Sequence, residues 1–278
     1  MGTPYVYAIL SHTKSSLKPQ NPTMKTPFLI IIALALPLAH AEPTGTIYQT
    51  ATRQTLTPVQ LAEQLKQADI VLIGEEHDNP QHHAAQQWLL EHTNRHTGST
   101  VLEMLAPEQQ QPINEVQTWF HQGGKSGMRS LAGKINWNMA WGWSQYQNVM
   151  HTLLTQTPAI VSGSPSRSEL VANQNFAPQG KFASQAKVQT ALSQIISNHH
   201  GGGNMVAMQQ YKDFRMAQAL LQSPKPAWLI AGNIHASKQL GVPLFLQDAG
   251  FSGSLKVLLL SSKDNEIDKQ HADYIWLF

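Results

Sequence analysis

The chain has 278 residues, 41% of them apolar, which is enough to build a large hydrophobic core without crosslinks. It contains no cysteine, which excludes disulfides, thiolate metal sites and a cysteine nucleophile. The formal net charge is +2, but three lysines and no acidic residue precede residue 42, so the remainder carries 16 basic against 17 acidic residues and lacks the positive charge of a nucleic-acid binder.

The first 41 residues contain a pattern typical of an export signal. Met24 is followed by a lysine, an apolar run over 28–38 and an A-H-A cleavage motif that ends at Ala41. The apolar run is too short for a membrane-spanning helix and contains a proline. We expect residues 1–23 to be an upstream extension, 24–41 to be a signal peptide, and 42–278 to form a single soluble domain in the periplasm of a Gram-negative cell.

Short apolar runs rich in β-branched residues recur along the chain, separated by segments of helical character. These runs are 70–73, 100–105, 159–163, 227–231, 255–261 and 274–278. Their alternation with helical segments predicts an α/β fold with a mostly parallel central sheet covered by helices on both faces. Residues 106–158 and 164–223 are too long for ordinary sheet connections and predict helical insertions.

Polar residues gather where two of the predicted strands end. The stretch IGEEHDNPQHH at 73–83 places Glu75 and His77 after the first run, and GNIH places His235 after a later one. Parallel strands end at the same edge of a sheet, so the two G-x-x-H turns should bring both histidines together. Glu103 lies in an apolar run, where a carboxylate is costly to bury unless it is paired or ligating. Such a cluster can bind a divalent ion or perform acid/base chemistry.

The second half of the 73–83 stretch is typical of a helix start. Asp78 or Asn79 suits the capping position and Pro80 suits the first turn. We therefore interpret His82 and His83 mainly as solvated helix residues that border the site. The zinc-binding motif H-E-x-x-H is absent, so a metal site is only weakly indicated.

Five separated motifs resemble the ChaN-like haem-binding uptake family of the Tiki superfamily, which is related to TraB and erythromycin esterase-like proteins. In chain order they are VLIGEEHDNPQHH, VLEML, WGWSQY, KDFRMA and IAGNIHASKQLGVP. The resemblance covers roughly 56–246 and implies an α/β haem-binding protein of bacterial iron acquisition, in which a dimer holds haem between its protomers. Members are often lipoproteins, but this chain has no cysteine to carry a lipid. The motif positions carried over are Glu75, His77, Glu103, Asp213, Asn233 and His235.

Haem requires an apolar slot, an axial ligand and partners for two propionates. The candidate haem-binding residues are Tyr146, Tyr211, His199, His200, His77, His235, Asn233 and Asp213. Tyr146 belongs to an aromatic cluster and is either a ligand or a core residue. Tyr211 lies on a predicted helix and is either a ligand or an ordinary amphipathic position. His199 and His200 precede three glycines and form either a ligand arm or a polar loop.

Three functions remain open at this point. The first is a periplasmic haem-binding protein of haem or iron uptake, with haem, a haem receptor or transporter and a second copy of the chain as partners. The second is a metal-dependent hydrolase, a peptidase or esterase of the Tiki type, in which His77, Glu103 and His235 surround the metal and Glu75 assists. The third is a metal-free acid/base enzyme like the esterase branch, in which histidine and glutamate activate water directly. The motif match favours haem binding, whereas the residue chemistry alone favours the hydrolase.

Overall fold

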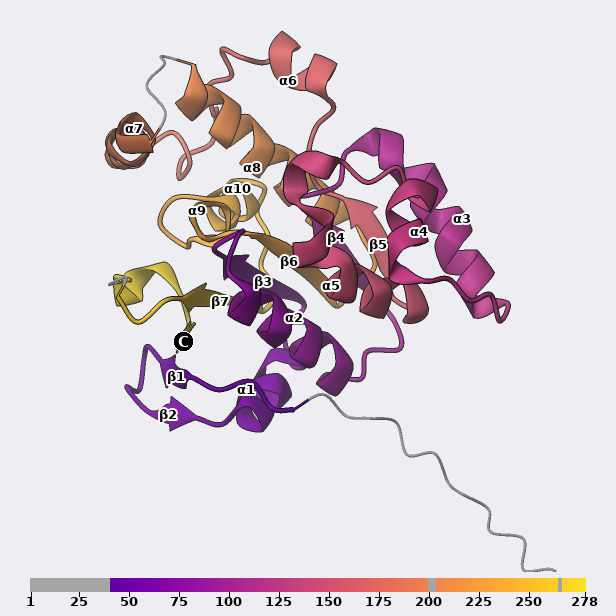
Figure 1. Ribbon diagram of the computed structural model, residues 1–278. Helices are drawn as coiled ribbons and strands as arrows, with labels where there is room; N and C mark the ends of the chain where they lie inside the picture. Colours follow the sequence, from indigo (N-terminus) through magenta and orange to yellow (C-terminus); the bar gives the residue numbers. More distant parts are fainter. Residues whose placement is uncertain (1–40, 200–203, 265–266) are drawn as a thin grey trace, which may run out of the picture. The chain divides into compact units, whose positions relative to one another are not determined.

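The computed structural model describes residues 41–199, 204–264 and 267–278, and expectations about residues 1–40 lie outside it (Figure 1). A sheet with the order β2-β1-β8-β7-β3-β6-β4-β5 runs through the described chain. The strands are β1 (Thr46–Gln49), β2 (Thr55–Leu56), β3 (Ile70–Glu75), β4 (Ser99–Leu102), β5 (Ala159–Ser162), β6 (Ala227–Gly232), β7 (Leu255–Ser261) and β8 (Tyr274–Leu277). Neighbours from β8 to β5 are parallel, and β1 is antiparallel to both of its neighbours. All six predicted strands and the mostly parallel α/β sheet are confirmed.

Helices cover both faces of the sheet. On one face lie α1 (Pro58–Leu65), α2 (Pro80–His92), α3 (Gln110–His121), α4 (Met128–Lys134) and α5 (Trp143–Thr155). The other side carries α6 (Arg167–Ala172), α7 (Ala186–His199), α8 (Met205–Gln222), α9 (Asn233–Ala236) and α10 (Val242–Asp248). The described residues also form the short 3-10 helices η1 (Pro107–Gln109), η2 (Met139–Trp141) and η3 (Lys269–His271). No helix of the described residues is long and apolar enough to cross a membrane.

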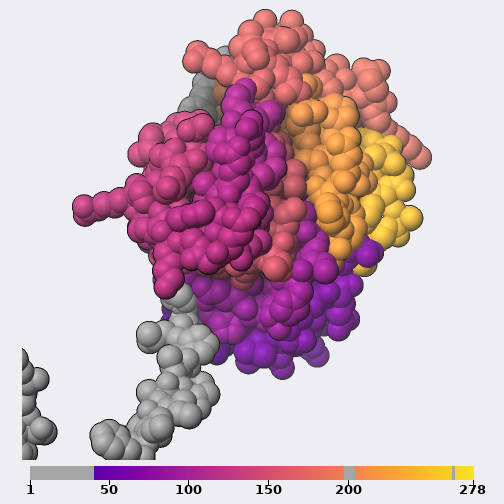
Figure 2. All heavy atoms as spheres, turned by 90° about the vertical axis from the view of Figure 1, so that its right-hand side faces the viewer, coloured from indigo at the N-terminus to yellow at the C-terminus, as the bar shows by residue number. Residues whose placement is uncertain are grey.

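The two predicted helical insertions are confirmed. Residues 106–158 contain α3, α4 and α5, and residues 164–223 contain α6, α7 and α8. In Figure 2 the magenta and salmon residues of these insertions form the left and upper parts of one face, above the indigo residues that precede them in the chain. The first insertion packs on one face of the sheet, where α5 lies beside α2 (Figure 1).

The core is divided into two halves by the sheet itself. Val71 and Ile73 pack among the helices of one face, whereas Ile70 and Leu72 pack among those of the other. Successive side chains of a strand point to opposite faces, and all four residues are fully buried. This two-sided burial explains why the central strands appear in the sequence as continuous apolar runs rather than as an alternating pattern.

The central strands end in register. Glu75 of β3 pairs with Gly232 of β6, and the backbone N–H of Glu103 donates to the carbonyl of Ile230 at 3.1 Å. Because β3, β4 and β6 run in the same direction, the residues that follow them share one sheet edge. The tertiary structure thus brings together polar residues that are up to 160 positions apart, from Glu75 to His235.

Helix α2 corrects one expectation from the sequence. Its start is as predicted, because the Asn79 side chain accepts from the Gln81 backbone N–H at 3.0 Å and Pro80 opens the first turn. His82 and His83, however, are 0% and 5% exposed, so the interpretation of these two as solvated residues was wrong. The reason is that α2 packs against both β3 and α5, which leaves much of its polar surface inside the protein.

Gly74 is expected to be essential for packing in the middle of the sheet. A Cβ there would lie 2.5 Å from both the Asn233 Oδ1 and a Leu259 methyl group. We expect Gly74→Ala to lower the free energy of unfolding by about 1–3 kcal/mol, as overpacked cores do. Gly133 is a matched control, because it lies in α4 with nothing near its Cβ position; Gly133→Ala should raise stability by roughly 0.5–1 kcal/mol. Urea denaturation measures both, and equal effects would contradict the packing argument.

Candidate functional site

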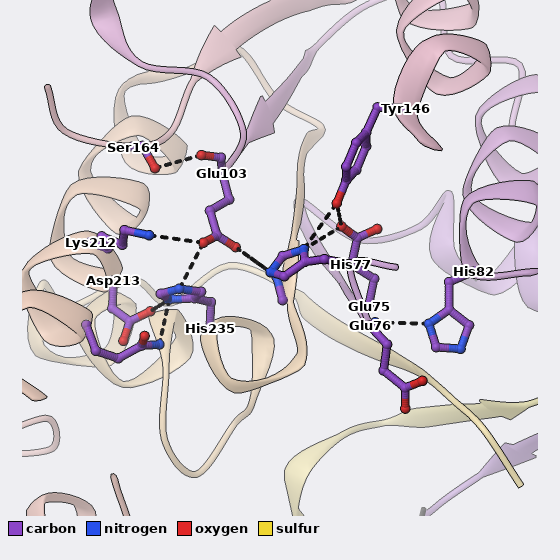
Figure 3. A network of polar contacts seen from close by, with 12 residues as sticks. Glu75, Glu76, His77, His82, Glu103, Tyr146, Ser164, Lys212, Asp213 and His235 are labelled. Carbon is purple, nitrogen blue, oxygen red and sulfur yellow. Dashed lines mark hydrogen bonds and ion pairs between the residues drawn. The ribbon is translucent and has the colours of Figure 1, made fainter. Parts of the chain in front are cut away.

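Two histidines lie at the carboxyl edge of the sheet, each between two acidic side chains (Figure 3). The Nδ1 of His77 is 2.9 Å from Glu75 Oε1, and its Nε2 is 3.8 Å from Glu103 Oε2. The Nδ1 of His235 is 2.6 Å from Asp213 Oδ1, and its Nε2 is 3.1 Å from Glu103 Oε1. Glu103 therefore stands between the two imidazoles, and the predicted convergence of the two G-x-x-H turns is confirmed.

Glu75 is buried and forms a hydrogen bond with His77. Its Oε1 accepts a hydrogen bond from the Tyr146 hydroxyl at 2.5 Å as well as one from His77. Its Oε2 accepts from the Gln86 side-chain amide and lies 3.3 Å from the His83 Nε2. Burial acts to raise the pKa of Glu75, but the hydrogen bonds from His77 and His83 outweigh it and hold the pKa at about 2. Glu75 is therefore ionised at neutral pH.

The ionised Glu75 determines the orientation of His77. Nδ1 carries the proton that is donated to Glu75, so a neutral His77 presents the lone pair of Nε2 on the opposite side of the ring. Burial lowers the pKa of His77, but the hydrogen bond to Glu75 and the charge of Glu103 raise it above its usual value. The side chain is 39% exposed and packs edge-on against Trp141, with 4.9 Å between ring centroids. A Cβ at Gly232 would lie 2.9 Å from Nε2, so the glycine leaves this nitrogen accessible.

Glu103 is the shared carboxylate and is almost completely buried. The Gly232 backbone N–H donates to its Oε2 at 2.9 Å, and the Lys212 ammonium donates to its Oε1 at 3.4 Å. Burial acts to raise the pKa of Glu103, but the positive charge and hydrogen bond of His235, with a contribution from Lys212, hold it well below the usual range. Its backbone carbonyl also accepts from the Ser164 hydroxyl, which ties β4 to the start of the second insertion (Figure 3).

His235 is buried and charged, and both of its ring nitrogens are paired with carboxylates. Burial lowers its pKa, but the carboxylates of Glu103 and Asp213 outweigh burial and raise it to about 9. Burial raises the pKa of Asp213 to about 6, against the opposing charge of His235. The Gln209 side-chain amide lies 2.9 Å from Nδ1. At neutral pH both ring nitrogens therefore carry protons that point at carboxylates, and neither offers a lone pair.

The three residues proposed as metal ligands contact one another directly. His77, Glu103 and His235 are linked through the carboxylate of Glu103. Among residues 41–199, 204–264 and 267–278, no group of three or more histidine and acidic side chains has the arrangement of a metal-ligand set. Of the two histidines, only His77 has a nitrogen available for a ligand or a proton.

Comparison with known proteins now assigns the family. The family model described as haem-binding uptake, Tiki superfamily, ChaN matches residues 61–246. The chain belongs to this family. A solved structure that describes cofacial haem binding to ChaN of Campylobacter jejuni matches with a TM-score of 0.76 and 28% identity, over 84% of this chain and 96% of that chain. The range 61–246 matched by the family model contains strands β3 to β6 and every residue of the histidine–carboxylate network.

Two further solved structures match too weakly to carry an argument. The type III effector HopBA1 has a TM-score of 0.43 and 13% identity, over 86% of this chain and 98% of that chain. The RRSP effector domain of a MARTX toxin from Vibrio vulnificus has a TM-score of 0.44 and 14% identity, over 82% of this chain and 38% of that chain. No curated protein matches the chain.

The two tyrosines suggested as haem ligands have different surroundings in this ChaN-family chain. Tyr146 is 1% exposed and its hydroxyl donates to Glu75, so it lies in the core. Burial and the charge of Glu75 raise its pKa, which disfavours a phenolate. The Tyr211 hydroxyl instead donates at 2.7 Å to Glu169, whose carboxylate forms an ion pair with Arg215 at 2.9 Å. Burial and the bond to Glu169 raise the pKa of Tyr211, but both charged partners are partly exposed.

The other residues proposed from the sequence to bind haem are Asp213, Asn233, His199 and His200. Asp213 faces into the site, as its motif position implied, and does not form a solvent pair. The Asn233 side-chain amide donates to the Leu260 carbonyl at 2.8 Å, which connects β6 to β7. The side chains of His199 and His200 lie outside the described part of the chain.

Three contributors to the site were missed by sequence reasoning. Gln86 donates to Glu75, Gln209 contacts His235, and Lys212 donates to Glu103. Lys212 had a signal, because it directly precedes Asp213 in the KDFRMA motif. The two glutamines had none, since a glutamine on a polar helix is ordinarily exposed.

An apolar groove of about 350 Å³ adjoins the network on the side of α8. Its apolar lining comes from α6, α7, α8 and α9 and comprises Leu170, Ile195, Ile196, Met205, Met208 and Ile234. Gln209 and Lys212 also line it, and both contact the histidine–carboxylate network. A second hollow of about 620 Å³ shares Ile195 and Ile234 with this groove, so the two are neighbours.

Proposed function

We propose that this protein binds haem and serves haem or iron uptake as an exported periplasmic protein. One observation carries the proposal: the ChaN family match extends over residues 61–246, which contain the whole polar network and both helical insertions. The structural likeness to C. jejuni ChaN, described as binding haem cofacially, supports it along nearly the full length of that chain. The export pattern before residue 42 supports the periplasmic location.

The groove beside α8 supports haem as the ligand. Pockets for small molecules and cofactors usually measure roughly 300–1,000 Å³ and are mostly apolar with a few polar groups. The groove falls in this range and is mostly apolar, and Lys212 supplies a cation suited to a propionate. Tyr211 lies on the same helix, and its partner Glu169 precedes Leu170 of the groove. We propose Tyr211 as the iron ligand. Its hydroxyl contacts the ion pair of Glu169 and Arg215, which is partly exposed, so the phenolic proton of Tyr211 can leave to solvent.

Haemin titration separates the two tyrosines. The wild-type protein should shift the Soret band at stoichiometric haemin, and Tyr211→Phe should weaken binding by at least the roughly 10–100-fold that loss of a supporting residue costs a metal site. Tyr146→Phe serves as the matched control, because it removes only a buried hydroxyl that contacts Glu75 and His77, and it should keep the haem spectrum. Absence of any Soret shift in the wild type would end the haem proposal, and an unchanged Tyr211→Phe would reject this ligand.

Assembly forms part of the same proposal. We propose that haem is held between two copies of the chain and passes to or from a haem receptor or transporter, as the family resemblance implies. Sedimentation of the protein with and without one equivalent of haemin tests the dimer, which should form or tighten when haem is present. A monomer at stoichiometric haem would reject it.

A second function is favoured by the orientation of His77. Its Nδ1 is fixed by an ionised carboxylate and its Nε2 is open, which is the arrangement that a general base requires. A hydrolase using this base, with or without an added metal ion, would act on an ester or peptide. Panels of both substrates, with and without zinc, manganese or cobalt, test it against His77→Ala. Activity that survives in His77→Ala would reject this role.

A further inference from the structure

Two methionines line the apolar groove beside α8. Met205 is the first residue of this helix and Met208 follows three positions later, so the two side chains lie on the same face of the helix. The rest of the described lining consists of leucine, isoleucine, glutamine and lysine side chains. The two thioethers are therefore the groups in the described lining that a peroxide oxidises readily.

Exposure distinguishes Met205 from the methionines of the core. Met205 is 38% exposed, whereas three other methionines are at most 2% exposed, namely Met104, Met150 and Met216. Met139 is 67% exposed, but it belongs to η2 and does not line the groove. A peroxide in solution reaches Met139 and Met205 first, because it must contact the sulfur atom to oxidise it. Met139 is therefore an internal reference for oxidation outside the groove.

Oxidation would change the chemistry of the groove. A thioether sulfur is apolar and a weak hydrogen-bond acceptor, whereas the oxygen of a sulfoxide is polar and accepts strongly. Met208 precedes Lys212 by four positions on α8, so the two are neighbours on the helix surface, and both line the groove. Met205 and Gln209 have the same spacing. A sulfoxide at Met208 can accept from the Lys212 ammonium and so compete with an anionic ligand for this cation.

We propose that Met205 and Met208 form an oxidation site that controls ligand binding in the groove. The oxidant is hydrogen peroxide. The sulfur lone pair attacks one peroxide oxygen, an S–O bond forms as the O–O bond breaks, and the other oxygen leaves with both hydrogens as water. The sulfur loses the two electrons that the peroxide gains. The reduced groove binds an apolar anion, and the oxidised groove binds it weakly. The inference rests on the proposed function for the identity of this anion as haem.

Titration before and after peroxide treatment tests the oxidation site. Two apolar anions serve as probes, haemin and 1-anilinonaphthalene-8-sulfonate, and the peroxide is removed before each titration. Peptide mass spectrometry identifies the methionines that gain an oxygen. We expect Met139 and Met205 to be oxidised before Met150 and Met216, and both probes to bind about tenfold more weakly, because a polar group left unpaired against the ligand costs about as much as a lost hydrogen bond. A methionine sulfoxide reductase with a thiol reductant should restore the affinity.

Leucine variants assign the loss of affinity to the groove. Met205→Leu combined with Met208→Leu keeps an apolar lining of similar volume that peroxide cannot oxidise. Each protein is compared with itself before and after treatment, so its starting affinity does not affect the result, and the double variant should not respond to peroxide. The two single variants should each respond less than the wild type. Met139→Leu is the matched control, because it removes the more exposed methionine outside the groove and should respond as the wild type does.

The two probes distinguish failure of this inference from failure of the haem proposal. If the untreated protein binds the sulfonate but not haemin, the haem function is rejected and the sulfonate titrations decide on the oxidation site. The oxidation site is overturned if neither probe binds the untreated protein, or if Met205 remains unmodified when Met139 is oxidised. An oxidised wild type that keeps its affinity, or a double leucine variant that loses affinity as the wild type does, also overturns it.

Discussion

Glu103→Ala lowers the free energy of unfolding by about 3–5 kcal/mol, the usual cost of removing one partner from a buried ion pair. The loss arises because Glu103 accepts from the Gly232 backbone and contacts both His235 and Lys212 from a position that is only 2% exposed. Without it, His235 retains a buried charge with only Asp213 as its carboxylate partner. Urea denaturation at pH 7 measures the effect.

Two variants make the Glu103 result specific. Glu108→Ala removes an exposed carboxylate of η1 and should change stability by less than about 0.5 kcal/mol. Glu103→Gln keeps the shape of the side chain and can still accept from Gly232, so it should be less destabilising than the alanine variant. A loss below 1 kcal/mol for Glu103→Ala would contradict the paired state of this carboxylate.

Raising the pH from 6.5 to above 9 destabilises the protein, with His235 contributing a loss on the order of 3 kcal/mol. The pKa of His235 is about 9 in the folded chain and near 6.5 in the unfolded chain. The folded state therefore binds the extra proton in this window. The stabilisation is fully present below pH 6.5 and disappears as the pH rises through 9.

Asp213 and Glu75 also make the free energy of unfolding depend on pH. Asp213, with its pKa raised to about 6, also loses stabilisation as the pH rises, between about 3.8 and 6. Glu75 has a pKa of about 2, and its contribution is lost in the opposite direction, as the pH falls from about 4.5 towards 2. We therefore expect maximal stability on the acidic side of neutrality, with losses in both directions.

Urea unfolding at half-unit steps from pH 6 to 9.5 measures the alkaline loss. In His235→Gln the slope between pH 6.5 and 9 should be largely absent, although the variant is less stable at pH 6. His77→Gln is the matched control, because His77 is partly exposed and only Nδ1 is closely paired, so it should keep most of the slope. A wild-type stability that does not change between pH 6.5 and 9.5 would mean that His235 is not held in its charged form.

The arrangement of the central strands was predictable from local patterns. The apolar run Ile70–Ile73 is buried on both faces, and such runs with helical segments between them indicate a parallel sheet. Because parallel strands end at one edge, the meeting of His77 and His235 followed from the same pattern. The short antiparallel β1 and β2 were not predicted, since four and two residues give too little periodicity to recognise.

Helix α2 shows where local patterns fail. The capping residue Asn79 was predictable because a cap depends on neighbours in the sequence. The burial of His82, His83 and Gln86 was not, because their polar character suggests solvent. Their burial results from packing against β3 and α5, and α5 is far away in the chain.

The amino-acid sequence by itself determined the α/β architecture, the two insertions and the sheet edge at which the G-x-x-H turns meet, because these depend on periodicity and strand direction. Only the tertiary structure decided that the two turns differ in chemistry. His235 receives Asp213 from α8 in addition to Glu103 and becomes a charged, closed imidazolium, whereas His77 is fixed by Glu75 and keeps its Nε2 open. Exposure and pKa depend on which side chains the insertions bring into contact, and that is a property of the packed molecule.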